Sequence, residues 1–149
     1  MIDDKFGALL QELSDVLKIE LTPDSNNNCK IEYPDKMVIT MEPNVLGDHL
    51  RLIVEIDKPG DGRYREEVLK EALLANNLPP PRNGIFCYGA KSNLLLLYDS
   101  ISFEDLSGVR LAEIIDILLK KGRQWKESIQ RGELPTHRSI ESKGGMFGL

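Results

Sequence analysis

The stretch HLRLIVEID, residues His49–Asp57, decides the fold class because apolar and polar side chains alternate along it. Aliphatic residues occupy the even positions from 50 to 56, and three of the odd positions carry a charge. Successive side chains of an extended chain point to opposite faces, so the stretch predicts a β-strand with one covered face and one solvated face. Such half-covered strands are typical of antiparallel sheets.

Two further strand candidates precede this stretch. Residues Cys29–Tyr33 alternate apolar and charged side chains, and residues Lys36–Glu42 place their methionines and Ile39 on one face. Pro34-Asp35 separates the first two runs and reads as a turn. Because the connections are short, the three runs predict an antiparallel meander.

Downstream, residues 63–77 carry apolar side chains at helical spacing, and the following prolines at 79–81 forbid a continued helix. Two more strands are predicted, at residues 84–90 and 93–100. The run Leu94–Leu97 is too continuous for a half-exposed strand. It should be buried on both faces, or buried on one face and covered by a partner on the other.

Amphipathic helices are predicted at both ends of the chain. The first spans about Phe6–Leu17, and the last opens at Phe103, with Ser102 as its N-cap, and closes near Gly132. The predicted order is helix, three strands, helix, two strands, helix: an α+β fold with helices packed on a twisted antiparallel sheet. Residues 1–132 are expected to form one domain, and residues 133–149 a flexible tail.

Composition limits the function classes. The 149 residues carry a net charge of −5 with a pI near 5.1, which argues against nucleic acid because phosphate binding needs a basic stripe. No run is long and apolar enough to span a bilayer, and the start lacks the pattern of a signal peptide. We therefore expect a cytoplasmic protein without membrane insertion. Cys29 and Cys87 are too few for a zinc site and predict small buried thiols.

Converging catalytic groups are not evident. His49 and His137 stand at a strand start and in the tail, and no metal-binding spacing surrounds them. Cys87 lacks an indicated base, and Gly60–Gly62 lacks the rest of a phosphate loop. We expect no enzyme, cofactor or metal. The competing hypothesis is a small hydrolase or ligand-binding domain with a pocket near Cys87 or His49.

Apolar surface exceeds what one core of this size usually takes up. Val38 and Ile53 oppose other apolar residues on their strands, and Leu94–Leu97 adds more. Part of this surface should face a second subunit or a bound protein, and Met37 or Met41 would add adaptable contact area if exposed. A core that satisfies itself is the open alternative.

A family resemblance rests on several spaced segments. These are Leu73–Asn77, Gly89, Asn93–Leu97, Leu106-Ser107, and Gln124–Ile129 with its tryptophan. Together with the element order and the acidity, they resemble the class I type III secretion chaperones of the Tir-chaperone (CesT-like) family. Leu118 belongs to the same set, and the resemblance covers Phe6 to about Arg131. It implies a bacterial cytoplasmic protein.

The resemblance implies a homodimer, with a heterodimer as the alternative, that binds the N-terminal segment of a secreted effector or gatekeeper protein in extended form. The implied client-binding residues are Phe6, Leu9, Leu10, Leu13, Ile31, Met37 and Ile39. An equally weighted alternative places them in the core. The implied dimer interface consists of Val68, Leu69, Ala72, Leu73, Ile85, Phe86 and Tyr88. A second hypothesis is a regulatory binding protein that contacts transcription or secretion-gate components.

Overall fold

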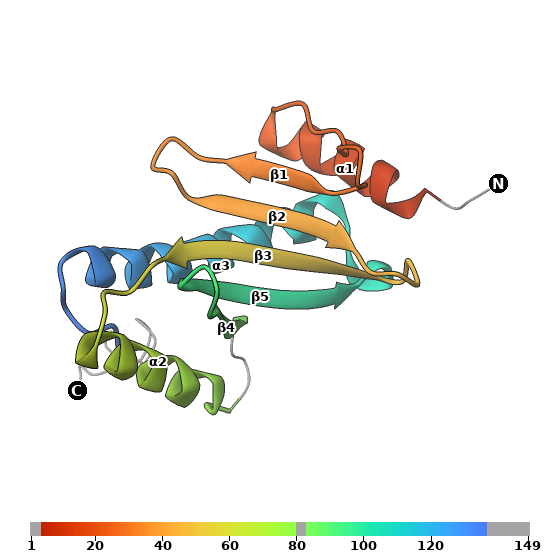
Figure 1. The fold of residues 1–149 in the computed structure, drawn as a ribbon. Coiled ribbons are helices and arrows are strands. Elements are labelled where there is room, and N and C mark those ends of the chain that lie inside the picture. The colour runs from red at the N-terminus through yellow and green to blue at the C-terminus, as the bar shows by residue number, and fades with distance from the viewer. Residues whose placement is uncertain (1–3, 80–82, 137–149) are drawn as a thin grey trace, which may run out of the picture.

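The computed structural model describes residues 4–79 and 83–136 (Figure 1). The described elements follow the predicted order and confirm the α+β fold. They are α1 (Lys5–Leu17), β1 (Cys29–Glu32), β2 (Val38–Pro43), β3 (His49–Asp57), α2 (Arg63–Asn76), β4 (Ile85–Gly89), β5 (Leu94–Ser102), the 3₁₀ helix η1 (Phe103–Asp105) and α3 (Gly108–Gln130).

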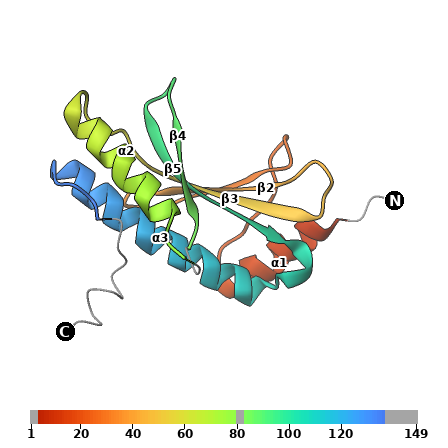
Figure 2. The ribbon, with the colours of Figure 1, turned by 90° about the horizontal axis from the view of Figure 1, so that it is seen from below.

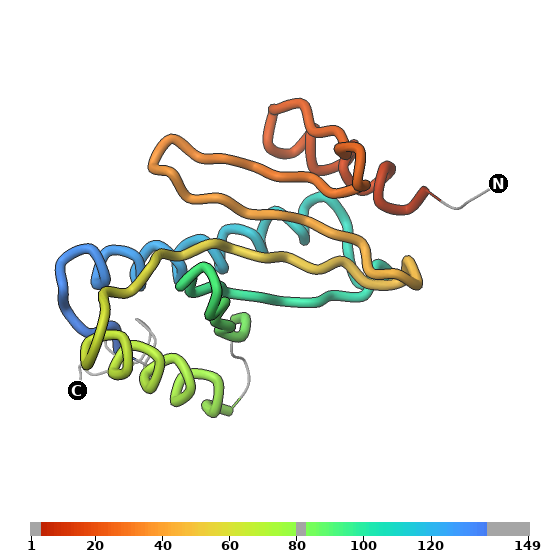
Figure 3. Tube along the Cα trace, in the orientation of Figure 1, coloured from red at the N-terminus to blue at the C-terminus, as the bar shows by residue number. Residues whose placement is uncertain are grey.

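The five strands form one antiparallel sheet in the order β1-β2-β3-β5-β4. The first three strands make the predicted meander. The chain then leaves the sheet through α2 and returns as the β4–β5 hairpin, whose second strand pairs with β3. The two edges of the sheet are therefore β1 and β4, and the tube in Figure 3 follows this path.

One face of the sheet carries the core. Along β3 the burial alternates strictly, and Leu50, Leu52, Val54 and Ile56 are at most 1% exposed. Helices α1 and α3 lie together against the sheet, as Figure 2 shows from below. Gly122 of α3 allows this approach, since an added Cβ would meet Met37 and Val54 side chains at 3.1 Å. The packing explains why these two helices are amphipathic.

Helix α3 begins later than the sequence predicts. Residues Phe103–Asp105 form a separate 3₁₀ turn, with the Ser102 hydroxyl accepting from the Glu104 N–H. Leu106 is extended, and Ser107 then caps α3 by accepting from the Arg110 N–H at 3.1 Å. Ser102 is thus the N-cap of the 3₁₀ turn, and Ser107 is the N-cap of the long helix α3.

Burial decides three points that the sequence left open or predicted. Leu95 and Leu97 are buried and Leu94 and Leu96 are partly buried, so the leucine run is not buried on both faces within the single chain, and the second alternative, with one buried face, fits it. The prediction that both cysteines are buried is wrong for one of them. Cys87 is exposed on the edge strand, whereas Cys29 is buried as predicted. The methionines at 37 and 41 are both fully buried and offer no contact area.

The described helices include none that is both long and apolar enough to cross a membrane. The proposed tail falls mostly on residues 137–149, which lie outside the described residues. Its first part is tied to the domain: the Tyr64 hydroxyl donates to the Glu133 carbonyl at 2.7 Å, and Pro135 is buried.

Candidate functional site

Strand β1 presents an open edge. The Tyr33 N–H donates to the Met37 carbonyl at 2.8 Å, and Ile31 stands opposite Ile39 in the same register. In an antiparallel ladder, alternate residues point their backbone groups toward the partner strand. Lys30 and Glu32 therefore direct their N–H and C=O groups away from β2, where no described strand pairs with them.

Strand β4, at the opposite edge, is closed by a side chain. The Asn76 amide accepts from the Phe86 N–H at 2.8 Å and donates to the Phe86 carbonyl at 3.0 Å. Asn76 thereby occupies the outward-facing backbone groups of Phe86, the second residue of this five-residue strand, as a neighbouring strand would. The edge of β1 is open among the described strands, whereas the edge of β4 is occupied at Phe86.

The packing of α2 holds Asn76 in place. Helix α2 contacts β4 and buries Val68, Ala72 and Ala75, whose small side chains allow the helix to come close. On the strand, the Phe86 ring lies 4.1 Å from the Trp125 ring of α3, centroid to centroid. Phe86 is thus fixed by side chain and backbone together, and the terminal asparagine of α2 meets it directly.

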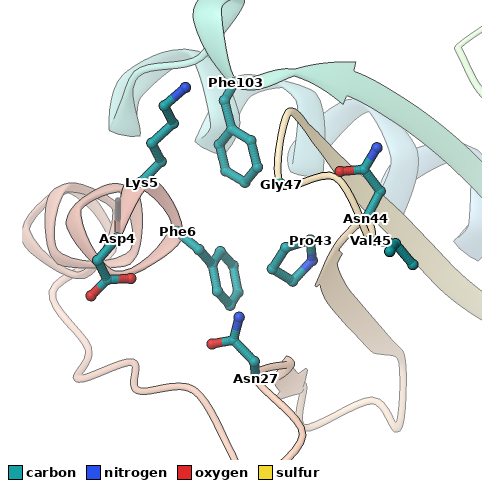
Figure 4. Close-up of a pocket in the computed structure, with 9 residues that line it drawn as sticks. All are labelled: Asp4, Lys5, Phe6, Asn27, Pro43, Asn44, Val45, Gly47 and Phe103. Atoms are coloured by element: carbon teal, nitrogen blue, oxygen red, sulfur yellow. The ribbon is translucent and has the colours of Figure 1, made fainter. Parts of the chain in front are cut away.

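A pocket opens close to the start of β1 (Figure 4). It has a volume of about 390 Å³ and is lined by Asp4, Lys5, Phe6, Asn27, Pro43, Asn44, Val45, Gly47 and Phe103. These residues come from the N-terminus of α1, the residues before β1, the β2–β3 connection and η1. The lining is mixed: two phenylalanine rings and a proline stand among charged and amide side chains. The pocket therefore offers both apolar contact and polar partners to a bound segment.

The β2–β3 turn beside the pocket is held rigidly by hydrogen bonds. The Asn44 side-chain oxygen accepts from the Asp48 and His49 N–H groups, and its amide donates to Asp48 Oδ1 at 2.7 Å. The hydrogen bonds from Asn44 and then His49 lower the pKa of the Asp48 carboxyl. This ordered turn presents Val45 and Leu46, which are 100% and 83% exposed.

The structure places all of the implied client-binding residues in the hydrophobic core. Phe6, Leu9, Leu10, Leu13, Ile31, Met37 and Ile39 are at most 6% exposed. Phe6 alone among them also lines the pocket. The sequence interpretation missed Val45, Leu46 and Phe103. A signal for the first two existed, because they stand in a turn between Pro43 and Gly47 where they have no strand to face.

The implied dimer residues divide into two groups. Val68, Ala72 and Phe86 are buried within the chain, and Leu69 and Tyr88 are partly buried. Leu73 and Ile85 are 69% and 42% exposed on α2 and β4, and Leu74 adds 38% exposure beside them. These last three residues form an uncovered apolar patch, which we call the α2–β4 patch.

Chemical reactivity finds little support in the described part of the chain. No group of three or more His, Cys, Asp or Glu side chains in it is placed to hold a metal ion. Burial, with a smaller contribution from Asp24, raises the pKa of the Cys29 thiol, which opposes formation of a nucleophilic thiolate. His49 hydrogen-bonds Asp48 at the β2–β3 turn, far along the chain from Cys87.

An open strand edge, an apolar turn held by hydrogen bonds and a pocket of mixed lining are features that binding of an extended polypeptide uses. The chain matches the Tir chaperone protein (CesT) family over residues 8–126, and it therefore belongs to this family of chaperones. A comparison with curated proteins finds no match.

Several solved structures share the fold. The chaperone–effector complex HopA1–SchA has a TM-score of 0.70 and 24% identity, covering 85% of this chain and 99% of the other. The Yersinia pestis type III secretion chaperone SycH, solved with a fragment of YscM2, has a TM-score of 0.64 and 19% identity, covering 78% and 96%. The ExsC–ExsE complex has a TM-score of 0.64 and 17% identity, covering 84% and 93%.

Proposed function

We propose that this protein is a cytoplasmic type III secretion chaperone that binds the N-terminal segment of a secreted effector or gatekeeper protein. Binding keeps that segment soluble and competent for export. The observation that carries the proposal is the open edge of β1 beside the pocket, in a chain of the CesT family. The fold it shares with chaperone–effector complexes supports the same function.

The client segment adds to the sheet as a sixth strand. Its backbone pairs with the outward N–H and C=O groups of Lys30 and Glu32, and its alternate side chains face the two sides of the sheet. Asn27 lines the pocket two residues before β1 begins, so a client strand that continues past Cys29 reaches the pocket. Phe6 contacts the client there, while the other six implied client-binding residues support β1 and the pocket from the core.

No covalent step is needed for this function. Strand addition uses backbone hydrogen bonds and the burial of apolar side chains, neither of which requires a cofactor or a metal. We assign residues 1–132 to the single binding domain. Two such domains form a homodimer through the α2–β4 patch, because an uncovered apolar patch on a regular element is typical of a subunit interface.

Capture of the tagged protein from its native cell, followed by mass spectrometry, tests the proposal. A secreted protein should be recovered, and trypsin should leave only its N-terminal segment protected. Recovery of only a polymerase subunit or another protein that is not exported would replace the proposal with the regulatory function.

The strand-addition mechanism has a sharper test. Lys30→Pro removes an N–H that faces away from β2, so the fold tolerates it as edge strands tolerate proline. Client affinity should fall at least about ten-fold, since backbone pairing is lost. Lys30→Ala removes the same side chain and is the matched control. Equal affinities of the two variants, with both folded, would exclude strand addition at β1.

A further inference from the structure

We propose that the client segment that pairs with β1 carries a basic, an apolar and an acidic residue in that order, and that Glu32 and Lys30 select it by charge. The inference rests on the proposed function, because it names the class of polypeptide that strand addition at β1 accepts. It adds a requirement that an open edge alone does not impose, namely the order of two charges along the client.

The charges of Lys30 and Glu32 lie on one side of β1. Burial alternates along this strand, so that Cys29 and Ile31 face the core, whereas Lys30 and Glu32 are exposed on the opposite face of the sheet. The same two residues direct their N–H and C=O groups away from β2. A strand that pairs with these backbone groups therefore places alternate side chains directly beside the two charges.

Neither charge has an ionic partner in the part of the chain that the structure describes. Across the β1–β2 ladder, Lys30 lies opposite Thr40 and Glu32 lies opposite Val38, and both of these β2 residues are uncharged. The side chains of Lys30 and Glu32 also make no hydrogen bond to another described residue. Pairing with a charged client residue therefore costs neither of them an existing contact.

Other charges around β1 are engaged within the chain. Glu42, on the same face of β2, pairs with Arg51 of β3 at 3.3 Å. Asp35, in the turn after β1, accepts from Arg123 Nε at 2.7 Å. The two charges on β1 itself thus remain for a polypeptide that adds to the edge.

Both ends of β1 are held, so the two charges keep a fixed spacing. Before the strand, Asp24 Oδ1 accepts from the Asn26 and Asn28 N–H groups at 2.8 and 3.0 Å. After the strand, Arg123 of α3 holds the turn through its ion pair, and its guanidinium lies 5.5 Å from the centre of the Tyr33 ring. A strand that is already ordered loses little entropy when a client pairs with it, so more of the charge attraction is expressed as affinity.

The direction of the client strand sets the order of its charges. The described strands all pair antiparallel, and an antiparallel client continues this pattern. The client residue beside Glu32 then comes two positions before the one beside Lys30. Opposite charges across a ladder stabilise the pair, and like charges destabilise it. The favoured order is therefore basic, then an apolar residue on the buried side of Ile31, then acidic.

Charges on an edge strand also deter indiscriminate pairing, and this general role would not depend on the sign of each charge. A selective role does depend on it, because a client is accepted only when its charges complement those of the edge. Exchanging the two charges of β1 therefore distinguishes the roles: only a selective edge changes the client that it prefers.

Selection from a peptide library tests the charge order. Short random peptides displayed on phage are selected against the full chain and against its variant Lys30→Glu with Glu32→Lys. The wild type should enrich the basic–apolar–acidic order over the reverse at least about three-fold, and the variant should invert this preference. Asp116→Lys with Lys120→Asp exchanges an exposed ion pair of α3 at constant net charge and should leave the preference unchanged. Circular dichroism checks that every variant is folded.

The outcomes separate this inference from the proposed function. Peptides that bind Lys30→Ala but not Lys30→Pro, with the same charge preference for the wild type and the exchanged variant, would overturn the inference and leave strand addition intact. An acidic–apolar–basic preference of the wild type would overturn the antiparallel order. If the selected peptides bind Lys30→Pro as well as Lys30→Ala, strand addition at β1 fails, and this inference fails with it.

Discussion

At the scale of single residues, Asp99 shows how burial opposes a charge in the sheet. It stands on β5 opposite the fully buried Leu52. The partial burial of Asp99 itself raises the pKa of its carboxyl above the ordinary value. A hydrogen bond from the Ser100 N–H at 2.8 Å lowers the pKa and offsets only part of this effect. A carboxyl with a raised pKa in the folded state contributes stability at low pH, and that contribution is lost as the pH rises through the folded pKa.

Asp99→Asn should therefore stabilise the protein near neutral pH, since the amide has no charge to desolvate. The melting temperature should rise at pH 7, and the difference from the wild type should shrink as the pH falls below the ordinary aspartate value of about 3.9. Thermal unfolding followed at several pH values measures both effects. A gain that is the same at pH 3 and pH 7 would show that ionisation of Asp99 is not its cause.

Gly108 is the residue on which the contact of α1 with α3 depends. Its N–H donates to Glu12 Oε1 at 2.8 Å, and a Cβ added at this position would lie 2.7 Å from the Glu12 backbone carbon. Gly108→Ala should lower the free energy of unfolding by about 1–3 kcal/mol, because backbone must shift to make room. Denaturant unfolding measures the loss. Gly60→Ala, whose Cβ would approach nothing closer than 3.8 Å, should change stability little.

At the scale of elements, the two edge strands differ because α2 ends in an asparagine. Asn76→Ala would leave both outward backbone groups of Phe86 without their present partners. Stability should fall by about 1–3 kcal/mol, and the freed edge of β4 should promote aggregation at high concentration. Unfolding curves and light scattering measure the two effects. Asn77→Ala replaces the exposed neighbour and serves as the control, so similar losses in both variants would contradict the assigned role.

The elements themselves were largely predictable from periodicity. The apolar residues at every even position of β3 can all be buried only if they share one covered face of a strand. The short connections then predicted the antiparallel meander. The start of α3 was not predictable in the same way. Ser102 and Ser107 are both acceptable caps, and only the extended backbone of Leu106 shows that the first turn ends before the second begins. Local sequence cannot rank two caps that differ in tertiary packing.

Side-chain exposure was harder to predict than secondary structure. The family resemblance implied that the apolar face of α1 meets a client, yet Leu10 and Leu13 are at most 1% exposed because α3 covers them in the same chain. Periodicity identifies an apolar face but not the element that covers it. Cys87 illustrates the converse case: it lies on the face of the sheet opposite the core, where even its partner Leu96 on the central strand β5 is only partly buried.

At the scale of the whole molecule, the α2–β4 patch should decide the oligomeric state. Leu73→Lys places a charge at the most exposed aliphatic residue of the patch, which would be buried in the proposed dimer. The dimer should dissociate at micromolar concentration to a single chain of 16.8 kDa, as read by light scattering after size-exclusion chromatography. Val109→Lys, at a 59% exposed position on α3, is the control. A wild-type protein that is already monomeric would refute the dimer itself.

The hydrogen bonds between Asn76 and Phe86 on β4 also bear on how the molecule would act on a growing β-aggregate. A sheet with two receptive margins would act as a bifunctional monomer and could be built into a fibre from both sides. Here the β1 edge is the proposed site of strand addition, and the β4 edge is occupied by Asn76 at Phe86, so with addition at β1 alone the chain would be monofunctional in the polymer sense. When the aggregation-prone segment of a client pairs with β1, as proposed, the aggregate cannot add a further strand at that point. The protein would act as a chain stopper, and a small amount of it should be enough to keep short oligomers of its client from lengthening.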